Sequence, residues 1–197
     1  MITTEQIKEL RDKTGISVMQ CKKALEEAGG DQEKALTILR SKGKEIASKK
    51  GERALGAGAV ASYIHATGTV GVLLELHCES DFVAKNDEFK ALAYDIAMHT
   101  AALNPKFVSS VHVSDEERAS ATQMFSEEVA KSGKPKDIQA KMLEGKLGTY
   151  FKEQTLLDQP FVKNPDITIK GIIDGAIQKF GERIEVARFA RFSVLDR

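Results

Sequence analysis

The residues of this 197-residue chain whose types and spacing suit chemistry lie in one short segment, Glu79-Ser80-Asp81-Phe82. An apolar run at 70–78 comes directly before it and predicts a β-strand, and a helical pattern follows. A turn at the end of a strand lets a rigid scaffold present side chains to a partner. The Asp81 carboxylate could disturb a metal or phosphate site, and the Phe82 ring could fill an apolar pocket. From residue types alone, however, burial of Phe82 in the core is the more common outcome, with Asp81 as a helix cap.

The histidines and cysteines do not form a recognisable catalytic or metal-binding pattern. They are His65, His77, His99, His112, Cys21 and Cys78. None has the spacing of zinc ligands or of a CxxC motif. A hydrolase that uses Cys78 with His77 or His65 is one hypothesis, but neighbours in a strand point to opposite faces, so His77 cannot pair directly with Cys78. His65 and His77 flank a predicted hairpin, which suggests a structural pair across its strands.

His99 shares a predicted helical stripe with Leu92, Ile96 and Leu103. A position on that stripe is typical of a partly buried histidine whose ring is hydrogen-bonded. Contact with a partner is the alternative interpretation. The sequence pattern alone does not distinguish a structural role of His99 from a contact with a partner.

Common catalytic and nucleotide-binding motifs are missing from the sequence. It has no Walker A loop, no GxGxxG turn and no nucleophile elbow. Lys+Arg and Asp+Glu both number 29, so the formal net charge is zero. A bulk electrostatic grip on nucleic acid is therefore not expected. The sequence favours a binding protein that is not an enzyme and needs no cofactor and no metal.

The composition predicts a cytoplasmic protein without a membrane partner. The start of the sequence does not resemble a signal peptide, and no apolar run is long enough to cross a bilayer. The two cysteines, Cys21 and Cys78, are far apart, as expected of thiols that stay reduced.

Residues 1–42 predict three short helices. The starts are marked by Thr3 with Gln6, by Ser17 with Gln20, and by Asp31, and the ends by Gly15, Gly29-Gly30 and Gly43. So small a bundle has no room for a catalytic cleft and is typical of a docking module. Residues 43–58, rich in lysine and glycine, predict a partly helical linker.

Residues 59–197 predict a core domain. Strands are expected at 59–65, 70–78 and 183–192, and helices at 89–103, 114–131, 136 to between 145 and 153, and 167–180, with a loop at 159–161. Strands at both ends of a helical insert predict an α+β fold, in which helices cover an antiparallel sheet.

Several motifs together resemble the family of translation elongation factor Ts. They are Leu10-Arg11-x-x-Thr14-Gly15, Cys21-Lys22-Lys23-Ala24-Leu25, Leu74-Glu75-Leu76-x-Cys78-Glu79-Ser80-Asp81-Phe82-Val83-Ala84-Lys85-Asn86, Ile96-Ala97-Met98-His99, Gly133-Lys134-Pro135, Glu144-Gly145-Lys146, Leu156-Leu157-x-Gln159-Pro160-Phe161-Val162, Gly181-Glu182-Arg183-Ile184 and Arg188-Phe189-x-Arg191-Phe192. They follow the family's order and cover nearly the whole chain.

The resemblance implies a guanine-nucleotide exchange factor for elongation factor Tu. The three helices would be a ubiquitin-associated-like domain that docks on the partner's nucleotide-binding domain. The segment inserted beside the partner's Mg²⁺ and nucleotide would comprise Ser80, Asp81, Phe82 and Val83, and His99 would lie close to the same surface. Docking of the N-terminal domain would use Val18, Met19 and Leu25. The length resembles the short form with one core copy, which forms homodimers.

The sequence departs from the family pattern at four positions, Gln20, Ser80, Arg183 and Ala187. Ser80 stands where the family often has threonine and keeps the hydroxyl group. Arg183 replaces the asparagine of a Gly-Glu-Asn-Ile pattern, which leaves details of the last strand open. The alternative function is a non-catalytic adaptor whose N-terminal helices bind a helix of another protein.

Overall fold

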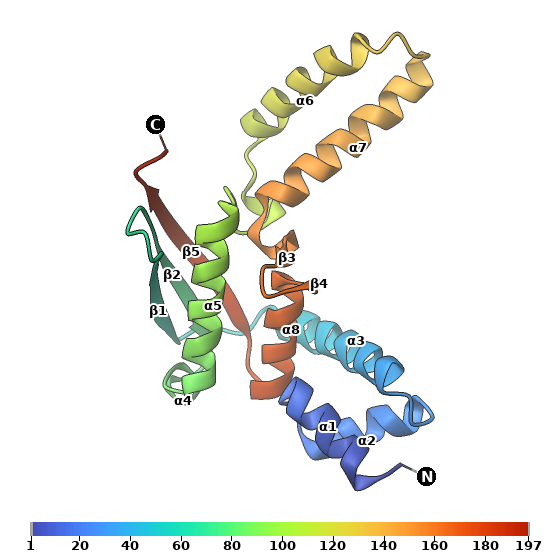
Figure 1. Ribbon diagram of the computed structural model, residues 1–197, viewed down its shortest axis with the longest axis vertical. Helices are drawn as coiled ribbons and strands as arrows, with labels where there is room; N and C mark the ends of the chain where they lie inside the picture. The colour runs from blue at the N-terminus through green and yellow to red at the C-terminus, as the bar shows by residue number, and fades with distance from the viewer. Residues whose placement is uncertain (1, 197) are drawn as a thin grey trace.

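The computed structural model, which describes residues 2–196, has three N-terminal helices followed by an antiparallel sheet with helices packed on one face (Figure 1). This is the α+β architecture that the sequence predicts. A search of the described residues finds no helix both long and apolar enough to cross a lipid bilayer.

The N-terminal helices are α1 (Thr4–Thr14), α2 (Val18–Glu27) and α3 (Gln32–Lys50). The three predicted starts are confirmed, because the side chains of Thr3, Ser17 and Asp31 each accept a hydrogen bond from a backbone N–H of the first turn. Buried side chains from these helices and their turns form one small apolar cluster, made of Leu10, Ile16, Cys21, Ala24, Leu25, Ala35 and Leu39.

The third helix is longer than predicted. Gly43 does not end α3, which continues to Lys50 and takes up the first half of the segment 43–58. Gly43 is buried against α8 (Ile169–Phe180), where an added Cβ would lie 3.3 Å from the backbone oxygen of Asp174. The glycine therefore permits close packing of α3 and α8. In the sequence alone, a glycine at this position predicts the end of a helix. The division into 1–42, 43–58 and 59–197 stays a prediction.

The sheet contains three antiparallel strands in the order β1-β2-β5. They are β1 (Ala57–Ile64), β2 (Val70–Cys78) and β5 (Ile184–Ser193). The predicted hairpin is confirmed, and its turn places Gly68 at a φ of 69°, which favours glycine. Pairing of β2 with β5 ends at Cys78 and Ile184, directly before the segment that contains Asp81 and Phe82.

Helices α4 (Asp81–Ala84), α5 (Asp87–Leu103) and α8 (Ile169–Phe180) complete the core. Alternate residues of β2 are buried against α5, and α8 adds a buried stripe of isoleucines at helical spacing. The main cluster includes Val72, Leu74, Leu76, Cys78, Phe89, Ala93, Ile96, Ala97, Leu156, Ile169, Ile173, Ile177, Ile184 and Val186. This packing supplies a rigid base for α4.

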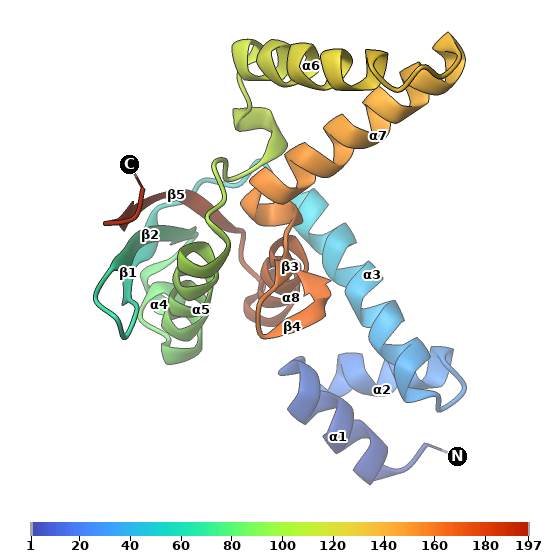
Figure 2. The same cartoon turned by 45° about the horizontal axis from the view of Figure 1, so that its top comes forward.

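Helices α6 (Asp115–Ala130) and α7 (Lys136–Gln154) form a hairpin that projects from the core, as both views show (Figures 1 and 2). The predicted capping box of Ser114 with Glu117 is confirmed at the start of α6. Along the long axis of the molecule, this hairpin lies at one end, and α4 lies with α1 and α2 at the other (Figure 1).

A two-stranded ribbon, β3 (Pro160–Phe161) with β4 (Asn164–Thr168), is absent from the sequence prediction. Residues 159–161 were expected to be a loop, and α8 begins at Ile169 rather than at Ile167. The side chain of Thr168 caps α8, so the residues before it are extended. Strands this short carry no usable periodicity, which explains the error.

Candidate partner-binding site

The segment after β2 forms a four-residue helix, α4, that presents two side chains to solvent. The side chain of Phe82 is 84% exposed, and that of Asp81 is 79% exposed. The only ion pair of Asp81 among the described residues is with Lys85, at 3.5 Å, and so exposed a pair contributes little. A carboxylate and a phenyl ring are therefore both available to a partner.

The more common outcome expected from residue types, burial of Phe82, is wrong. Ser80 rather than Asp81 caps α4, since the Ser80 hydroxyl oxygen accepts the N–H of Val83 at 3.5 Å. The helix thus starts with Asp81 and Phe82 on its outer side. Leaving a phenylalanine ring in water forgoes about 2 kcal/mol of burial energy in the free protein, so its display calls for a functional explanation.

Val83 and Ala84 hold α4 in place. Both are buried in the main apolar cluster, together with Cys78 at the end of β2. Val83 therefore does not form part of the exposed surface of the free protein and supports α4 from the core, and its direct contact with a partner stays a prediction. The first two residues of α4, Asp81 and Phe82, thus lie on its exposed side, and the last two, Val83 and Ala84, lie on its buried side.

The turn before α4 is fixed by residues that are distant in sequence. Glu79 accepts the backbone N–H of Arg183 at 2.6 Å, and its other oxygen lies 3.2 Å from the guanidinium of Arg53. The hydrogen bond from Arg183 is the largest cause that lowers the pKa of Glu79 below its ordinary value, and Arg53 adds to it while burial opposes it. These contacts join residues that are 104 and 26 positions apart in the chain, and no local pattern of the sequence indicates them.

His99 lies inside the core and has no exposed surface. Its Nδ1 accepts the N–H of Val162 at 3.2 Å, so in the neutral ring Nε2 carries the proton and donates to Gln159 at 2.9 Å. The structural interpretation of His99 is thus supported, since the ring is enclosed in the free protein and hydrogen-bonded at both nitrogens. Contact of His99 with a partner stays a prediction.

Stability is expected to fall on acidification because of His99. Burial lowers the pKa of His99 below its ordinary value of 6.5, with the Gln159 hydrogen bond opposing, so the unfolded chain binds the proton more readily. A proton on Nδ1 would face the N–H group of Val162, so the folded protein favours the neutral ring. The stabilisation is therefore complete above pH 6.5, where the ring is neutral in both states, and is lost as the pH falls below it. One such proton changes the free energy of unfolding by at most about 1.4 kcal/mol per pH unit.

Urea unfolding of the protein and of His99→Gln between pH 7.5 and 5 measures this effect. The slope of stability against pH should become smaller in His99→Gln and stay unchanged in the control His112→Gln, whose ring is exposed. Equal slopes for all three proteins would refute the assignment.

Cys78 lacks the surroundings of a catalytic nucleophile. Its buried thiol donates to the carbonyl oxygen of Ser80 at 3.3 Å, and burial, followed by the charge of Glu182, raises its pKa. His77 instead contacts Glu75 at 2.8 Å, and His65 contacts Tyr63 at 3.1 Å. The expected pairing of His65 with His77 across the hairpin is wrong, since Gly58 is the residue opposite His77.

The docking residues expected in the N-terminal domain separate into two groups. Met19 is 82% exposed and Val18 is 53% exposed, both in the first turn of α2. Leu25 is fully buried in the N-terminal apolar cluster and packs in the core of the free protein, so its docking role stays a prediction without an exposed side chain to support it. The helical period places Leu25 on the inner face of α2 with Cys21. Val18 and Met19 stay candidates for docking.

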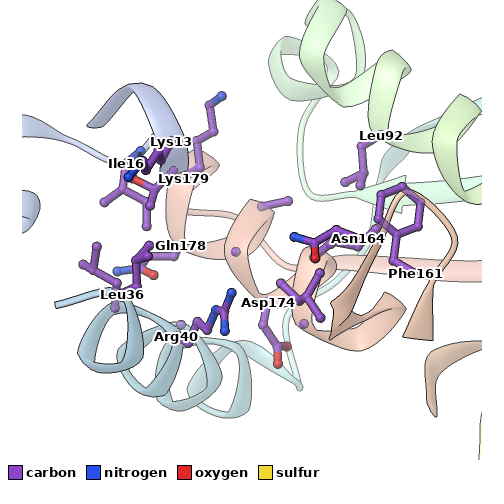
Figure 3. Close-up of a pocket in the computed structure, with 18 of the residues that line it drawn as sticks. Lys13, Ile16, Leu36, Arg40, Leu92, Phe161, Asn164, Asp174, Gln178 and Lys179 are labelled. Atoms are coloured by element: carbon purple, nitrogen blue, oxygen red, sulfur yellow. Dashed lines mark hydrogen bonds between the residues drawn. The ribbon is translucent and has the colours of Figure 1, made fainter. Parts of the chain in front are cut away.

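A cleft of about 620 Å³ lies between the N-terminal helices and α8 (Figure 3). Leu36 and Arg40 of α3 line it on one side, and Leu92 and Phe161 line it on another. None of the residues 80–83 lines this cleft. The predicted site is thus a projecting helix and not a cavity, which favours contact with a large partner over binding of a small molecule.

One polar contact and one buried carboxylate lie beside this cleft. Gln178 of α8 donates to Gln20 of α2 at 2.9 Å and so joins the two parts of the chain. Asp174 is buried next to Gly43, and its Oδ2 has no hydrogen-bond partner in residues 2–196. Burial raises the pKa of Asp174, while the charges of Lys170 and Lys44 oppose this effect.

Among residues 2–196, no group of three or more histidine, cysteine or acidic side chains is placed to hold a metal ion.

Comparison with known proteins connects this arrangement to one family. The sequence model described as Elongation factor TS matches residues 16–196. Elongation factor Ts of Carboxydothermus hydrogenoformans is 49% identical over 194 residues, which cover 98% of this chain and 89% of that protein. Elongation factor Ts of Thermodesulfovibrio yellowstonii is 48% identical over 193 residues, which cover 98% of this chain and 96% of that protein. Elongation factor Ts of Thermosipho melanesiensis is 45% identical over 194 residues, which cover 98% of this chain and 99% of that protein. With matches of this extent, the chain belongs to the elongation factor Ts family of translation factors.

Proposed function

We propose that this protein is the guanine-nucleotide exchange factor of elongation factor Tu and returns it to the GTP form during translation elongation. The observation that carries the proposal is the display of Asp81 and Phe82 on a short helix, within a chain of the elongation factor Ts family. The protein is not an enzyme in this role. It acts through differential binding to two states of its partner.

Exchange follows from thermodynamic linkage. A factor that binds nucleotide-free elongation factor Tu more tightly than the GDP complex must weaken GDP binding by the same ratio. Phe82 would enter an apolar pocket of the partner, and Asp81 would compete with the groups that hold Mg²⁺ beside the nucleotide. Ser80 keeps these residues at the start of α4, and Val83 anchors the helix in the core.

The N-terminal helices provide a second contact in this proposal. Val18 and Met19 form an exposed apolar pair at the start of α2, which is suited to pack on the nucleotide-binding domain of the partner. Residues 1–42 would then serve as the docking domain. Two separate contacts on one partner increase affinity, because the second forms within an existing complex.

The decisive experiment measures release of labelled GDP from elongation factor Tu by stopped flow, with and without this protein. A rate that rises with the concentration of the protein and reaches a maximum is expected. If the rate stays at its spontaneous value at every concentration, while residues 1–50 alone still bind a partner helix, the adaptor hypothesis replaces the exchange factor.

We also propose that two copies of the chain associate through the outer face of the sheet. Ile64 and Phe192 lie on either side of Gly71 in one row across the three strands, and Leu73 lies in the next row. All three apolar side chains are exposed, on the face opposite the one that α5 covers. A contiguous apolar patch of this kind is typical of an interface.

Sedimentation equilibrium tests this association. The protein is expected to sediment as a dimer and Phe192→Asp as a monomer, because a buried carboxylate without a partner is strongly unfavourable. Val111→Asp, which changes an exposed side chain outside the sheet, should leave the dimer intact. A monomeric wild-type protein would exclude this interface.

A further inference from the structure

The end of β2 and the start of β5 are joined beyond their last paired residues by two crossed carboxylates. Past the pair of Cys78 with Ile184, Glu79 reaches from the first strand and Glu182 from the second. One oxygen of Glu182 accepts the backbone N–H groups of Glu79 at 3.1 Å and of Ser80 at 3.0 Å. In return, Glu79 accepts the N–H of Arg183. Side chains therefore continue the connection where the ladder of backbone hydrogen bonds has ended.

The other oxygen of Glu182 controls the cap of α4. It accepts the hydroxyl proton of Ser80 at 2.5 Å, which leaves the lone pairs of the Ser80 oxygen to accept the N–H of Val83. A helix of four residues cannot persist by itself, because nucleation of a single turn is unfavourable. The geometry of α4 thus depends on the packing of Val83 and Ala84 and on a cap that Glu182 orients.

Glu182 is itself held in place by the end of α3. It follows Gly181, whose φ of 71° ends α8 in a conformation that favours glycine. Lys50 donates to the carbonyl oxygen of Gly181 at 2.5 Å, and the guanidinium of Arg183 donates to the backbone carbonyl oxygen of Arg53 at 2.6 Å. Both neighbours of Glu182 are therefore tied to the segment that connects the N-terminal helices to the sheet.

We propose that Glu182 is a positioning residue for nucleotide exchange: its carboxylate holds the turn at Glu79 and Ser80, and through it the orientation in which Asp81 and Phe82 project. The proposal rests on the proposed function, since it concerns the same exposed helix. A helix that is ordered before binding loses less conformational freedom when it binds the partner. Removal of the Glu182 carboxylate therefore weakens the contact of α4 with the partner, although Glu182 itself does not contact the partner.

The first measurement is hydrogen exchange in the free protein. In Glu182→Ala, the α4 amides of Ala84 and Lys85 are expected to exchange about tenfold faster or more, because the helix opens more often. Amides in the middle of α5 should not change. Glu52→Ala removes an exposed carboxylate from the neighbouring segment and serves as the matched control, for which no change is expected. Unchanged protection of α4 in Glu182→Ala would overturn the proposal.

The second measurement is GDP release from elongation factor Tu in a double-mutant cycle. Glu182→Ala is expected to reduce the stimulation about tenfold in the wild-type background and to have no further effect in the double variant Asp81→Ala with Phe82→Ala, because Glu182 acts through the side chains that this helix presents. Equal reductions in both backgrounds, or no reduction in the wild type, would overturn the positioning role. Glu182→Gln, which keeps one carbonyl oxygen as an acceptor, is expected to give a smaller loss and replaces the alanine variant if that variant fails to fold.

The two proposals fail in different ways. If the wild-type protein stimulates GDP release and Phe82→Ala reduces it, but Glu182→Ala does not, the exchange function stands and the positioning role falls. If the wild-type protein has no effect on GDP release, the proposed function falls and the role in exchange falls with it. The protection of Ala84 and Lys85 then still decides whether Glu182 orders α4.

Discussion

Replacement of Phe82 by alanine is expected to reduce the stimulation of GDP release from elongation factor Tu about thirtyfold or more, which corresponds to a loss of about 2 kcal/mol in binding energy. The ring is exposed in the free protein and makes no contribution to the core. Its burial in a pocket of the partner would therefore appear only in the complex. The thermal stability of Phe82→Ala should match that of the wild type, because no buried contact is removed.

The control for this prediction is Val111→Ala, which removes another exposed apolar side chain outside the proposed contacts. It should leave the maximal rate of exchange unchanged. Asp81→Ala is expected to act in the same direction as Phe82→Ala, since both side chains leave the same turn of α4. If the double variant Asp81→Ala with Phe82→Ala stimulated GDP release as well as the wild type, insertion of this helix would not be the mechanism.

Replacement of Phe89 by alanine should have the opposite profile, with a loss of about 3–5 kcal/mol in the free energy of unfolding. Phe89 has no exposed surface and lies in the main apolar cluster between α5 and the sheet. Its ring meets that of Phe180 edge to face, with centroids 6.3 Å apart. Truncation removes the transfer energy of the ring and leaves a cavity that the sheet and α8 can close only in part.

Urea unfolding followed by circular dichroism measures this loss. The midpoint should move to lower urea while the slope stays constant, because the surface exposed on unfolding is nearly unchanged. Phe82→Ala is the matched control in the same stretch of chain and should unfold at the wild-type midpoint. A loss below about 1 kcal/mol for Phe89→Ala would mean that the core around α5 is less tightly packed than the structure indicates.

Local signals in the sequence were sufficient for most elements. Capping residues such as Thr3, Asp31 and Ser114 satisfy backbone groups within their own first turn, so the starts of α1, α3 and α6 could be predicted without knowledge of the fold. The alternation of β2 and the isoleucine stripe of α8 have the same local origin. The order of strands and helices then predicted an α+β core.

The errors arose where a distant segment decided the outcome. Gly43 looks like a helix stop but is the point where α3 approaches α8. Leu25 and Val83 were expected to contact a partner because of the resemblance to the family, and both pack inward in the free protein. Glu182 stands in a motif of the family, but nothing in that motif indicates its role, because its partners Glu79 and Ser80 lie more than one hundred positions earlier in the chain.

The sequence by itself determined most elements, the α+β class and, through its resemblance to one family, the segment from Ser80 to Val83 as the expected site. Residue types and periodicity alone did not separate Phe82 from Phe89, since both are phenylalanines beside a predicted helix start. Only the tertiary structure decided that Phe89 is enclosed by α5, α8 and the sheet while Phe82 projects into solvent. The physical reason is that burial depends on which segments meet in space, and the turn that aims Phe82 outward is held by Glu182 from the far end of the chain.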